Sequence, residues 1–508
     1  MELKYGMPTR VLMGKDCVHY HRAEFFALGK KALIVTGAHS AKANGALDDL
    51  LKALTANGQS FVVYDKIRSN PGVGCVYEGA ALAKGHKVDF IVAIGGGSPM
   101  DAAKVIALLA CQDISEADLF VGKYGADVLP VVCIPTTAGT GSEVTQYAIL
   151  TNDRAETKSG IAGPQLFPRL ALLDAKYLKG LSRPNETNTV IDALSHSIEG
   201  IVSARANALT DLLALEGIRL VSECLTDLAE GTLSEAQREK LLLASTLGGM
   251  VIANTGTTAL HAMGYSLTYF KNIDHGRANG LLLAEYLKVV HGSRSDLTQK
   301  ILGAMKLNSI AGLSFVMEKL LGEIEKITRE EMTVFSGKAI ASKNIANGIV
   351  ALTEADILNV FAAVFGGGPT AAKVRDKRHA DVGFVTLEEY LPVSHFRLIP
   401  PKLRSIPGGL SEIAVELEVS QALAAKLNFP VHWNGKLYGF VHDNDNLKNV
   451  FADAMPKEVC HRRIFLNDWG EEVLISFENS ENGKEIARFV TVEEVQNLLN
   501  ECRKVIDY

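Results

Sequence analysis

The chain has 508 residues, of which 47% are hydrophobic and 22% are charged, and its formal net charge at pH 7 is −6. This composition is typical of a soluble globular protein, the length predicts two or three domains, and the absence of a basic run argues against a nucleic-acid partner. The seven cysteines form no CxxC pair, which favours free thiols in a reducing cytoplasm over a disulfide framework or a zinc ribbon.

The N-terminal segment MELKYGMPTR lacks the apolar run of a signal peptide. The first third of the chain then alternates apolar, β-rich runs with helical patterns. Strands are predicted at 31–37, 61–67, 89–97 and 129–139, and helices between them at 44–58 and 75–86. Apolar strands that alternate with helices predict a parallel sheet covered on both faces.

The segment DFIVAIGGGSPMDAAK (89–104) is an apolar strand that ends in three consecutive glycines, Gly95, Gly96 and Gly97. Ser98 is in the position of a helix N-cap, and Asp101 is in the position of a capping-box acid. The pattern predicts a glycine turn that leads into a helix N-terminus, where backbone N–H groups bind anions. Met100 replaces the last glycine of GxGxxG, so a tight turn without a ligand is the alternative.

A second loop, PTTAGTGSEVT (135–145), also follows an apolar strand. Its hydroxyl groups and glycines could line a phosphate or nicotinamide pocket, although such a loop is often only a turn. Both loops follow predicted parallel strands, and open α/β sheets bind ligands at the carboxyl ends of their strands. Together they favour a nucleotide site over two simple turns.

From about residue 182 to about residue 365, long helical patterns predict an all-helical domain. No charged residue occurs between Lys240 and Lys271, a length that could span a bilayer. Asn254 and His261 lie inside this stretch with several glycines and threonines. Polar residues of this kind argue against a membrane span, and we expect a helix buried in the protein interior.

Four side chains of this helical region could bind a metal ion. Asp192 and His196, in DALSHSIE (192–199), lie one helical turn apart on the same face. His261 is expected late in the charge-free helix, and His275 in a loop beyond its end. One carboxylate and three imidazoles suit Fe²⁺ or Zn²⁺ better than calcium or magnesium. Satisfied buried polar groups are the alternative for each residue singly.

Beyond residue 365 the composition changes again. The segment 365–383 is rich in glycine and charge and is expected to be a connector. An Asn-Gly within 430–441 predicts a hairpin, and the segments 460–468, 471–478 and 485–492 predict further strands before a closing helix. We expect a small α+β module over 384–508.

Five motifs resemble, in order and spacing, those of the iron-containing (group III) alcohol dehydrogenases from near residue 5 to about residue 365. They are VLMGKDCV, GGGSPMDAAK, PTTAGTGSEVT, IDALSHSIEG and HAMGYSLTYFKNIDHG. The resemblance implies a dinucleotide-binding α/β domain over 1–181 and an all-helical metal-binding domain over 182–366. We expect a homo-oligomer, namely a homodimer, in the cytoplasm.

The resemblance also implies the site residues. The metal ligands would be Asp192, His196, His261 and His275, with Fe²⁺ as the ion and Zn²⁺ as the alternative. The cofactor would be NADP(H) or NAD(H), bound by residues of the loops and strand ends, namely Gly37, Asn70, Gly95, Gly96, Gly97, Ser98, Asp101, Thr136, Thr137, Thr140, Ser142 and Lys158. The implied reaction is hydride transfer between the nicotinamide and a small alcohol or aldehyde, with the metal ion as Lewis acid.

The chain departs from the family pattern at two site positions and in its tail. Tyr265 occupies the place of a histidine that follows the third ligand by one turn, so a phenol is the expected catalytic proton relay. Gly37 occupies the place of an aspartate, which removes a carboxylate that would repel a 2′-phosphate. With donors nearby at His39, Ser40 and Lys42, NADP(H) is predicted to be accepted and preferred.

The expected function is therefore that of a metal-dependent NAD(P)-linked alcohol dehydrogenase that works as an aldehyde reductase. One alternative is a glycerol dehydrogenase-like or dehydroquinate synthase-like enzyme on the same fold. The four-ligand set favours the alcohol dehydrogenase, since glycerol dehydrogenases generally use fewer ligands. The other alternative is a catalytically weakened metal–nucleotide binding protein with a regulatory or assembly tail, which only Tyr265 and the tail favour.

Overall fold

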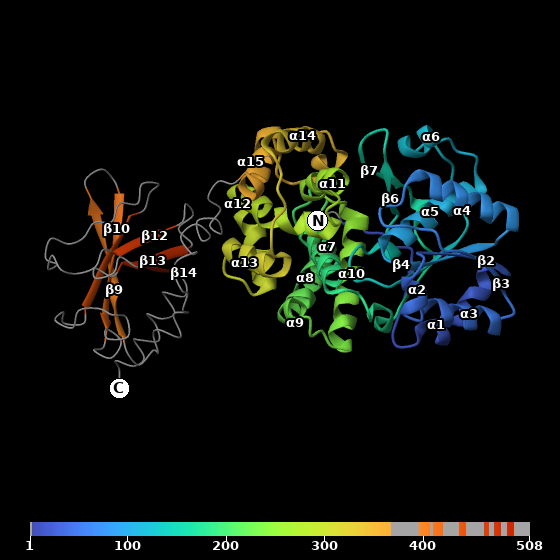
Figure 1. Cartoon of the computed structure of the whole chain (residues 1–508), viewed down its shortest axis with the longest axis horizontal. Helices are drawn as coiled ribbons and strands as arrows, with labels where there is room; N and C mark the ends of the chain where they lie inside the picture. The colour runs from blue at the N-terminus through green and yellow to red at the C-terminus, as the bar shows by residue number, and fades with distance from the viewer. Residues whose placement is uncertain are drawn as a thin grey trace. The chain divides into compact units, whose positions relative to one another are not determined.

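The computed structural model describes residues 3–366 and six strands between residues 396 and 491. The chain forms two compact units, Met1–Gly368 and Pro369–Tyr508. Figure 1 shows the sheet and the helices of the first unit in blue to yellow. Among the described residues, no helix is both long and apolar enough to cross a membrane.

A six-stranded parallel sheet with the order β1-β8-β5-β4-β2-β3 begins the first unit. Its strands are β1 (Arg10–Met13), β2 (Lys31–Thr36), β3 (Ser60–Tyr64), β4 (Phe90–Gly95), β5 (Val131–Pro135) and β8 (Leu170–Leu173). The four strands predicted from apolar runs are confirmed, whereas β1 (RVLM) and β8 (LALL), which have only four residues each, were not predicted. Ile34, Val92 and Val132 lie in register across the central strands and are fully buried.

Helices cover both faces of this sheet (Figure 1). Successive strand residues point to opposite faces, so Leu33 packs in the core with α4 and α5 while Ile34 packs in the core with α1 and α3. The helices of this part are α1 (Cys17–Tyr20), α2 (Ser40–Ala43), α3 (Ala46–Ala56), α4 (Val73–His86), α5 (Gly97–Cys111) and α6 (Glu116–Val121). The helices predicted at 44–58 and 75–86 are therefore confirmed.

An antiparallel hairpin, β6 (Tyr147–Asn152) and β7 (Thr157–Ala162), connects the sheet to the helical part, because β6 packs against α5 and β7 against α11. Lys158 lies on this hairpin opposite Thr151. The described residues also contain the 3-10 segments η1 (Arg22–Leu28), η2 (Ser142–Val144), η3 (Pro164–Leu166), η4 (Ala175–Leu178) and η5 (Lys343–Asn347).

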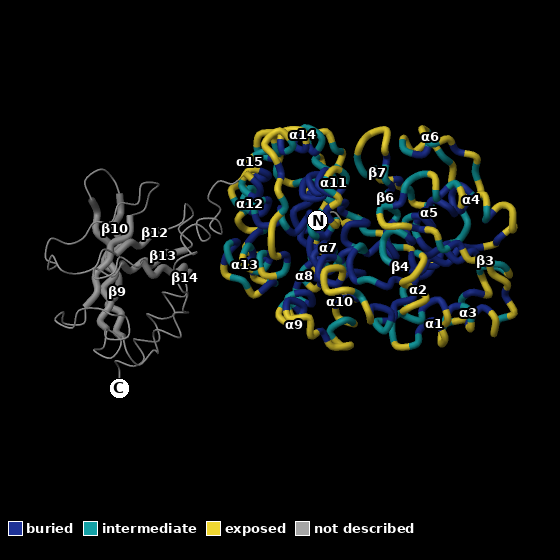
Figure 2. The backbone as a smooth tube through the Cα atoms, viewed as in Figure 1, coloured by how far each residue is buried: buried dark blue, intermediate teal, exposed yellow. Residues whose placement is uncertain are grey.

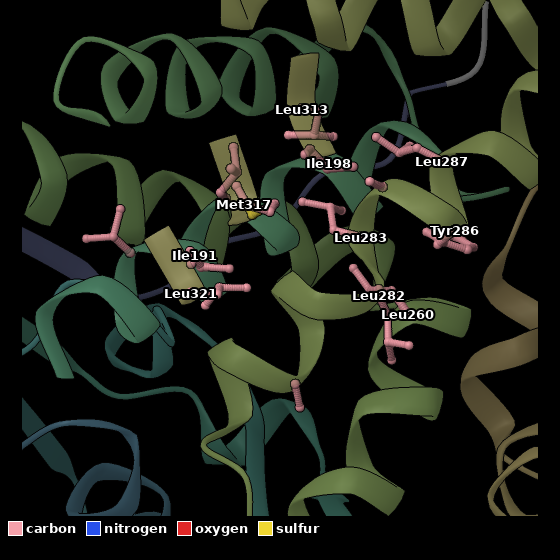
Figure 3. Close-up of a cluster of buried hydrophobic side chains, with 14 of the residues drawn as sticks. Ile191, Ile198, Leu260, Leu282, Leu283, Tyr286, Leu287, Leu313, Met317 and Leu321 are labelled. Atoms are coloured by element: carbon pink, nitrogen blue, oxygen red, sulfur yellow. The ribbon is translucent and has the colours of Figure 1, made fainter. Parts of the chain in front are cut away.

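The remainder of the first unit is helical, as predicted. Its helices are α7 (Arg183–Ile201), α8 (Ala208–Ser222), α9 (Leu225–Glu230), α10 (Glu235–Thr255), α11 (Ala259–Lys271), α12 (His275–Met305), α13 (Ile310–Leu321), α14 (Arg329–Ile340) and α15 (Glu354–Phe365). Ile191 and Ile198 of α7 share one apolar core with Leu283 and Leu287 of α12 (Figure 3). Figure 2 shows α7 buried along nearly all of its length, so side chains on this helix have fixed surroundings.

The charge-free stretch is not one helix, and that expectation is wrong. Helix α10 ends at Thr255, Gly256 has a φ of +69°, and α11 begins at Ala259. The Arg205 guanidinium leaves no room for a side chain at Gly256, where a Cβ atom would lie 2.2 Å from Nη2, and its Nε donates to the Thr255 carbonyl at 2.9 Å. The last residues of α10 are thus bonded by a distant segment, a contact that the local pattern could not indicate.

The described strands of the second unit form two antiparallel sheets, β11-β10-β9 and β12-β13-β14. They are β9 (Phe396–Ile406), β10 (Leu410–Val419), β11 (Lys436–His442), β12 (Arg462–Leu466), β13 (Glu472–Glu478) and β14 (Glu485–Thr491). The strands predicted within 460–468, 471–478 and 485–492 are confirmed. The connector after residue 366, the Asn-Gly turn and the closing helix lie outside the described residues.

Candidate active site

Helix α7 presents the first two candidate ligands. Asp192 and His196 are both buried, and the Asp192 Oδ1 atom lies 3.9 Å from the His196 Nε2 atom. Ser182 caps this helix by accepting from the backbone N–H of Asn185. Because both residues belong to α7 and are four positions apart, their side chains lie on one face of the helix, as the sequence predicts.

The two other histidines reach the same face from the ends of α11 and α12. Because α10 stops at Gly256, His261 lies in the first turn of α11 rather than late in a long helix. Helix α11 ends at Asn272, which has a φ of +53°, and α12 begins at His275 itself. The expectation that His275 lies in a loop is therefore wrong, since a short turn leads directly into the next helix.

The four side chains converge. The Asp192 Oδ1 atom lies 3.6 Å from the Nε2 atom of His261 and 3.7 Å from that of His275. The ligand atoms of these three residues all lie within 4.8 Å of one another, and the His196 Nε2 atom lies 3.1 Å from the His261 Nε2 atom.

The spacing of these atoms fits a single ion. Atoms bound tetrahedrally to one ion at about 2.0–2.2 Å lie roughly 3.4 Å apart. Without a metal ion, the protonated His261 Nε2 can donate to the His196 Nε2 atom across this 3.1 Å contact, so both atoms already face the same point. This donor set of one carboxylate and three imidazoles suits Fe²⁺ or Zn²⁺.

Two residues that the sequence analysis did not single out hold the ligands. The Glu199 carboxylate, fully buried on α7, bonds the His261 Nδ1 atom. The Asn279 side-chain amide donates to the Asp192 Oδ1 atom at 3.1 Å. Glu199 follows Asp192 by seven residues, so helical spacing could have placed it on the ligand face. For Asn279, 87 residues after Asp192, the sequence contains no comparable signal.

The electrostatics of the cluster favour metal binding. Burial would raise the pKa of Asp192, but the imidazoles of His196 and His275 outweigh it and lower the pKa well below the usual range. Burial lowers the pKa of both His196 and His275. Burial also disfavours the charged form of His261, but the Glu199 and Asp192 carboxylates outweigh it and raise its pKa to about 9. Without a metal ion the site therefore combines an ionised carboxylate, the neutral imidazoles of His196 and His275, and a protonated His261, whose proton metal binding at neutral pH would release.

Tyr265 lies beside the cluster. Its ring is stacked on that of His275, with centroids 5.5 Å apart and an interplanar angle of 17°. Burial raises the pKa of its phenol, and the Glu199 and Asp192 carboxylates raise it further. The hydroxyl group is therefore protonated at neutral pH and can act only as a hydrogen donor or neutral acceptor.

The two predicted nucleotide loops pack against each other. Thr136 N–H donates to the Gly95 carbonyl at 3.0 Å, so the loops start side by side at the ends of β4 and β5. A Cβ atom on Gly96 would lie 3.0 Å from the Thr137 Oγ1 atom, and other glycine contacts in these loops are equally close. The first backbone N–H groups of α5 have no acceptor within the helix, and a helix N-terminus of this kind suits an anion.

The start of α5 differs from the prediction. The helix begins at Gly97 with Gly96 as its N-cap, so Ser98 is already inside the helix. Asp101 is not a capping-box acid, because its carboxylate accepts from the Ser142 hydroxyl at 2.6 Å and from the Ile149 N–H at 2.9 Å. Asp101 thus ties the first loop to the second loop and to β6.

A buried lysine that the sequence analysis did not single out holds the second loop. Lys104 is fully buried on α5. Its ammonium donates to the Ser142 hydroxyl at 2.7 Å, the Thr145 hydroxyl at 3.2 Å and the Tyr147 carbonyl at 2.7 Å. Burial lowers its pKa, and the Asp101 carboxylate opposes this effect. The sequence feature that could have indicated this buried lysine is its position as the single charged residue in the apolar stretch after Asp101.

The second loop also contacts the helices that carry the ligands. A Cβ atom on Gly139 would lie 2.7 Å from the Thr189 Cβ atom of α7, and one on Gly141 would lie 2.5 Å from the Gly249 Cα atom of α10. Thr140, between these glycines, packs against Gly97 of the first loop. The nucleotide loops and the ligand helices are therefore in direct contact.

The other predicted cofactor residues lie at strand ends. Asn70 has a φ of +52°, and its carbonyl accepts from the Thr151 hydroxyl at 3.0 Å. Burial lowers the pKa of Lys158 to about 8, against the opposing effect of the Asp192 and Asp101 carboxylates. Gly37 follows β2.

An ion pair near Gly37 bears on the cofactor prediction. His39 and Ser40 are exposed there, as the prediction of phosphate donors requires. The Lys42 ammonium, however, pairs with the Asp65 carboxylate at 2.8 Å. Asp65 therefore brings a carboxylate to this edge of the sheet, which the sequence pattern after β2 did not indicate.

Comparison with known proteins identifies the family. The model for iron-containing alcohol dehydrogenases matches residues 8–175, and that for the C-terminal part of the Fe-containing alcohol dehydrogenase family matches residues 186–365. Alcohol dehydrogenase 4 of Schizosaccharomyces pombe is 37% identical over 288 residues, which are 56% of this chain and 68% of that protein. The 1,3-propanediol dehydrogenase of Citrobacter freundii is 36% identical over 262 residues, 50% of this chain and 66% of that protein.

A solved structure extends the comparison to the fold. An iron-containing alcohol dehydrogenase of Thermotoga maritima aligns with a TM-score of 0.67 and 36% identity over 72% of this chain and 99% of that one. The chain spans about two thirds of the curated relatives' length and nearly all of this structure. The chain belongs to the iron-containing alcohol dehydrogenase family, whose members are NAD-linked oxidoreductases of alcohols and aldehydes.

Proposed function

We propose that Asp192, His196, His261 and His275 bind one divalent metal ion at which a small alcohol or aldehyde exchanges a hydride with NAD(P). The observation that carries this proposal is that three histidine Nε2 atoms lie 3.6–3.9 Å from one carboxylate oxygen of Asp192. The family supports Fe²⁺ as the ion. Zn²⁺ is the alternative, because imidazole and carboxylate suit both ions and availability decides occupancy.

The residues of the chain have separate tasks in this reaction. A bound metal ion would supply a Lewis acid, and the nicotinamide would carry the hydride. His275 is 23% exposed while the side chains of the other ligands are at most 6% exposed, so substrate approaches from the His275 side. Tyr265 borders that side and carries a protonated hydroxyl that can donate to the substrate oxygen, which supports aldehyde reduction as the working direction.

The two nucleotide loops are the proposed phosphate and nicotinamide site. Direct contact of the second loop with α7 and α10 supports a nicotinamide placed next to the metal ion. We propose that NADP(H) is accepted and preferred, because Gly37 offers no carboxylate and exposed donors follow it. Asp65 is paired with Lys42, so its charge is partly compensated.

Replacing His275 with alanine tests the metal site. Elemental analysis of the purified wild-type protein should find one Fe²⁺ or Zn²⁺ per chain, and His275→Ala should lose most of the metal and the aldehyde reductase activity. NADPH binding should stay within about 3-fold of wild type, because the nucleotide loops belong to other elements. His291, on the same helix α12, provides the matched control, and His291→Ala should keep both metal and activity.

Two outcomes would contradict the proposal. Full reductase activity after exhaustive chelation, with no metal detected, would mean that the four residues are only a polar cluster. Binding of metal and NADPH without turnover of any short aldehyde would instead favour the weakened binding protein.

We also propose that the protein is a cytoplasmic homodimer with separate domains over 1–181 and 182–366. The division is supported by the cores: the two sheet faces bury two apolar clusters, and the helices bury a third. Light scattering after size exclusion would measure the mass of the assembly against the 54.7 kDa of one chain.

A further inference from the structure

Glu199 forms hydrogen bonds through both of its carboxylate oxygens to the residues around His261. It is fully buried on α7. One carboxylate oxygen, Oε1, accepts from the N–H and the hydroxyl of Thr258, both at 2.7 Å, and from the His261 N–H at 3.3 Å. The other oxygen, Oε2, bonds the Nδ1 atom of the His261 ring. The Thr258 hydroxyl also bonds the Tyr286 hydroxyl at 2.9 Å.

The first oxygen caps helix α11. The first N–H groups of any helix have no partner within it, and Thr258, the N-cap residue of α11, does not cap it with its own side chain. Glu199 supplies the missing acceptor from a different helix, and its negative charge also suits the helix N-terminus. The start of α11, which carries His261, is therefore held by α7, which carries Asp192 and His196.

The second oxygen determines which nitrogen of His261 is free. An ionised carboxylate only accepts hydrogen bonds, so the Nδ1 atom of His261 must carry a hydrogen. In the neutral ring the lone pair is then on Nε2, the atom that lies 3.6 Å from Asp192 and 3.1 Å from His196. Partners of this kind fix the ring and the tautomer of metal-bound histidines.

We propose that Glu199 is a positioning residue that selects the metal-binding tautomer of His261 while it caps the helix that carries this ligand. The proposal rests on the proposed function, since it requires a metal ion at His261. It assigns Glu199 two tasks that a single substitution can separate.

Glu199→Gln separates these tasks because glutamine has the same shape as glutamate. Its amide oxygen can remain on the Thr258 side, where three donors require an acceptor. Its NH₂ group then faces His261 Nδ1, which must become an acceptor, so the hydrogen moves to Nε2 and blocks metal binding. Metal affinity should fall about 10–100-fold, the usual effect of losing such a partner, while the Tm of the metal-free protein changes little.

The matched control is Glu186→Gln. Glu186 is also a buried glutamate on α7, but its partner is Arg238, whose Nε lies 2.7 Å from its carboxylate. This variant loses a charged hydrogen bond of α7 without touching the metal site. It should therefore keep the wild-type affinity for metal even if its Tm falls.

The experiment measures the Kd for Zn²⁺ by competition with a chromophoric chelator, on the full chain, together with the Tm of the metal-free protein. A 10–100-fold weaker Kd for Glu199→Gln, with an unchanged Kd for Glu186→Gln, supports the proposal. A wild-type Kd for Glu199→Gln, or equal weakening in both variants, overturns it. Absence of Zn²⁺ and Fe²⁺ binding by the wild-type chain would overturn the proposed metal function itself.

Should Glu199→Gln fail to fold, Glu199→Asp decides. Its carboxylate is one methylene shorter and cannot reach Thr258 and His261 together. A weaker Kd for Zn²⁺ in folded Glu199→Asp, with Glu186→Asp unchanged, supports the proposal, and a wild-type Kd overturns it.

Discussion

Replacing Lys104 with methionine removes a buried ammonium and leaves its partners without a donor. Methionine has nearly the same length and creates no cavity, so the change isolates the charge and its hydrogen bonds. The lost bonds go to the Ser142 and Thr145 hydroxyls and to the Tyr147 carbonyl, and Asp101, whose Oδ1 lies 3.8 Å away, loses a counter-charge.

The expected cost follows from these contacts. Three hydrogen bonds from a charged donor contribute about 1.5–3 kcal/mol each. This gain is offset by the several kcal/mol that burial of an ammonium costs. Removing one partner of a buried charge pair usually destabilises by about 3–5 kcal/mol, and Lys104→Met should fall in this range. The second nucleotide loop should also loosen, which raises the KM for NADPH.

Urea unfolding followed by far-UV circular dichroism measures the apparent free energy of unfolding. Tryptophan fluorescence is unsuitable, because both tryptophans, Trp433 and Trp469, lie in the second unit. Lys52→Met is the matched control at a side chain that is 79% exposed, and it should change stability by less than about 0.5 kcal/mol.

A double-mutant cycle with Asp101→Asn tests the mechanism. Because Lys104 and Asp101 interact, the double variant should lose about 1–3 kcal/mol less than the two single variants together. The reasoning is refuted if Lys104→Met unfolds at the wild-type urea concentration with an unchanged KM for NADPH, since the buried ammonium would then contribute neither stability nor loop order.

Two further substitutions test the remaining site predictions. Tyr265→Phe keeps the ring stacked on His275, so the metal content should not change. If the hydroxyl group relays the proton, kcat for aldehyde reduction should fall about 100-fold or more. An unchanged kcat would show that Tyr265 is not part of the proton path. Gly37→Asp should lower the NADP:NAD ratio of kcat/KM at least about 10-fold, because a carboxylate repels the 2′-phosphate. A Cβ atom there would lie 3.3 Å from the Ile67 carbonyl oxygen, which must then shift slightly. Gly37→Asn makes the same steric demand and supplies the uncharged control; equal ratios in all three proteins would contradict the prediction.

Much of the fold follows from local patterns. Apolar runs alternating with helical patterns predict β2, β3, β4 and β5 and their parallel arrangement; β2, β4 and β5 contain few polar residues because they are buried on both faces, whereas β3 is a largely exposed edge strand. The sequence also predicts that the glycine run after β4 lies close to the hydroxyl-rich loop after β5, since parallel strands bring their carboxyl ends to one edge of the sheet. The Asp192–His196 pair needed only helical periodicity, which a single segment determines.

Other features depend on residues that are far apart in the sequence. At the end of α10 the Thr255 carbonyl accepts from Arg205, whose guanidinium also leaves no room for a Cβ atom at residue 256, and a pattern confined to residues 241–270 contains no trace of that contact. The position of His261 at the start of α11 follows from this break, whereas His275 begins α12 because α11 ends at Lys271 and a short turn follows it. Their convergence with α7 could be expected from the family resemblance but not from spacing.

The supporting partners were decided only by the tertiary structure. Asp101 bonds Ser142 and the N–H of Ile149 rather than its own helix, and Glu199 bonds residues about 60 positions later. The physical reason is that a buried polar group must find a partner wherever packing brings one. Local patterns in the sequence determined most strands and helices and pointed to the candidate site residues, whereas tertiary packing decided the helix break after Thr255 and which distant donors and acceptors satisfy the buried side chains.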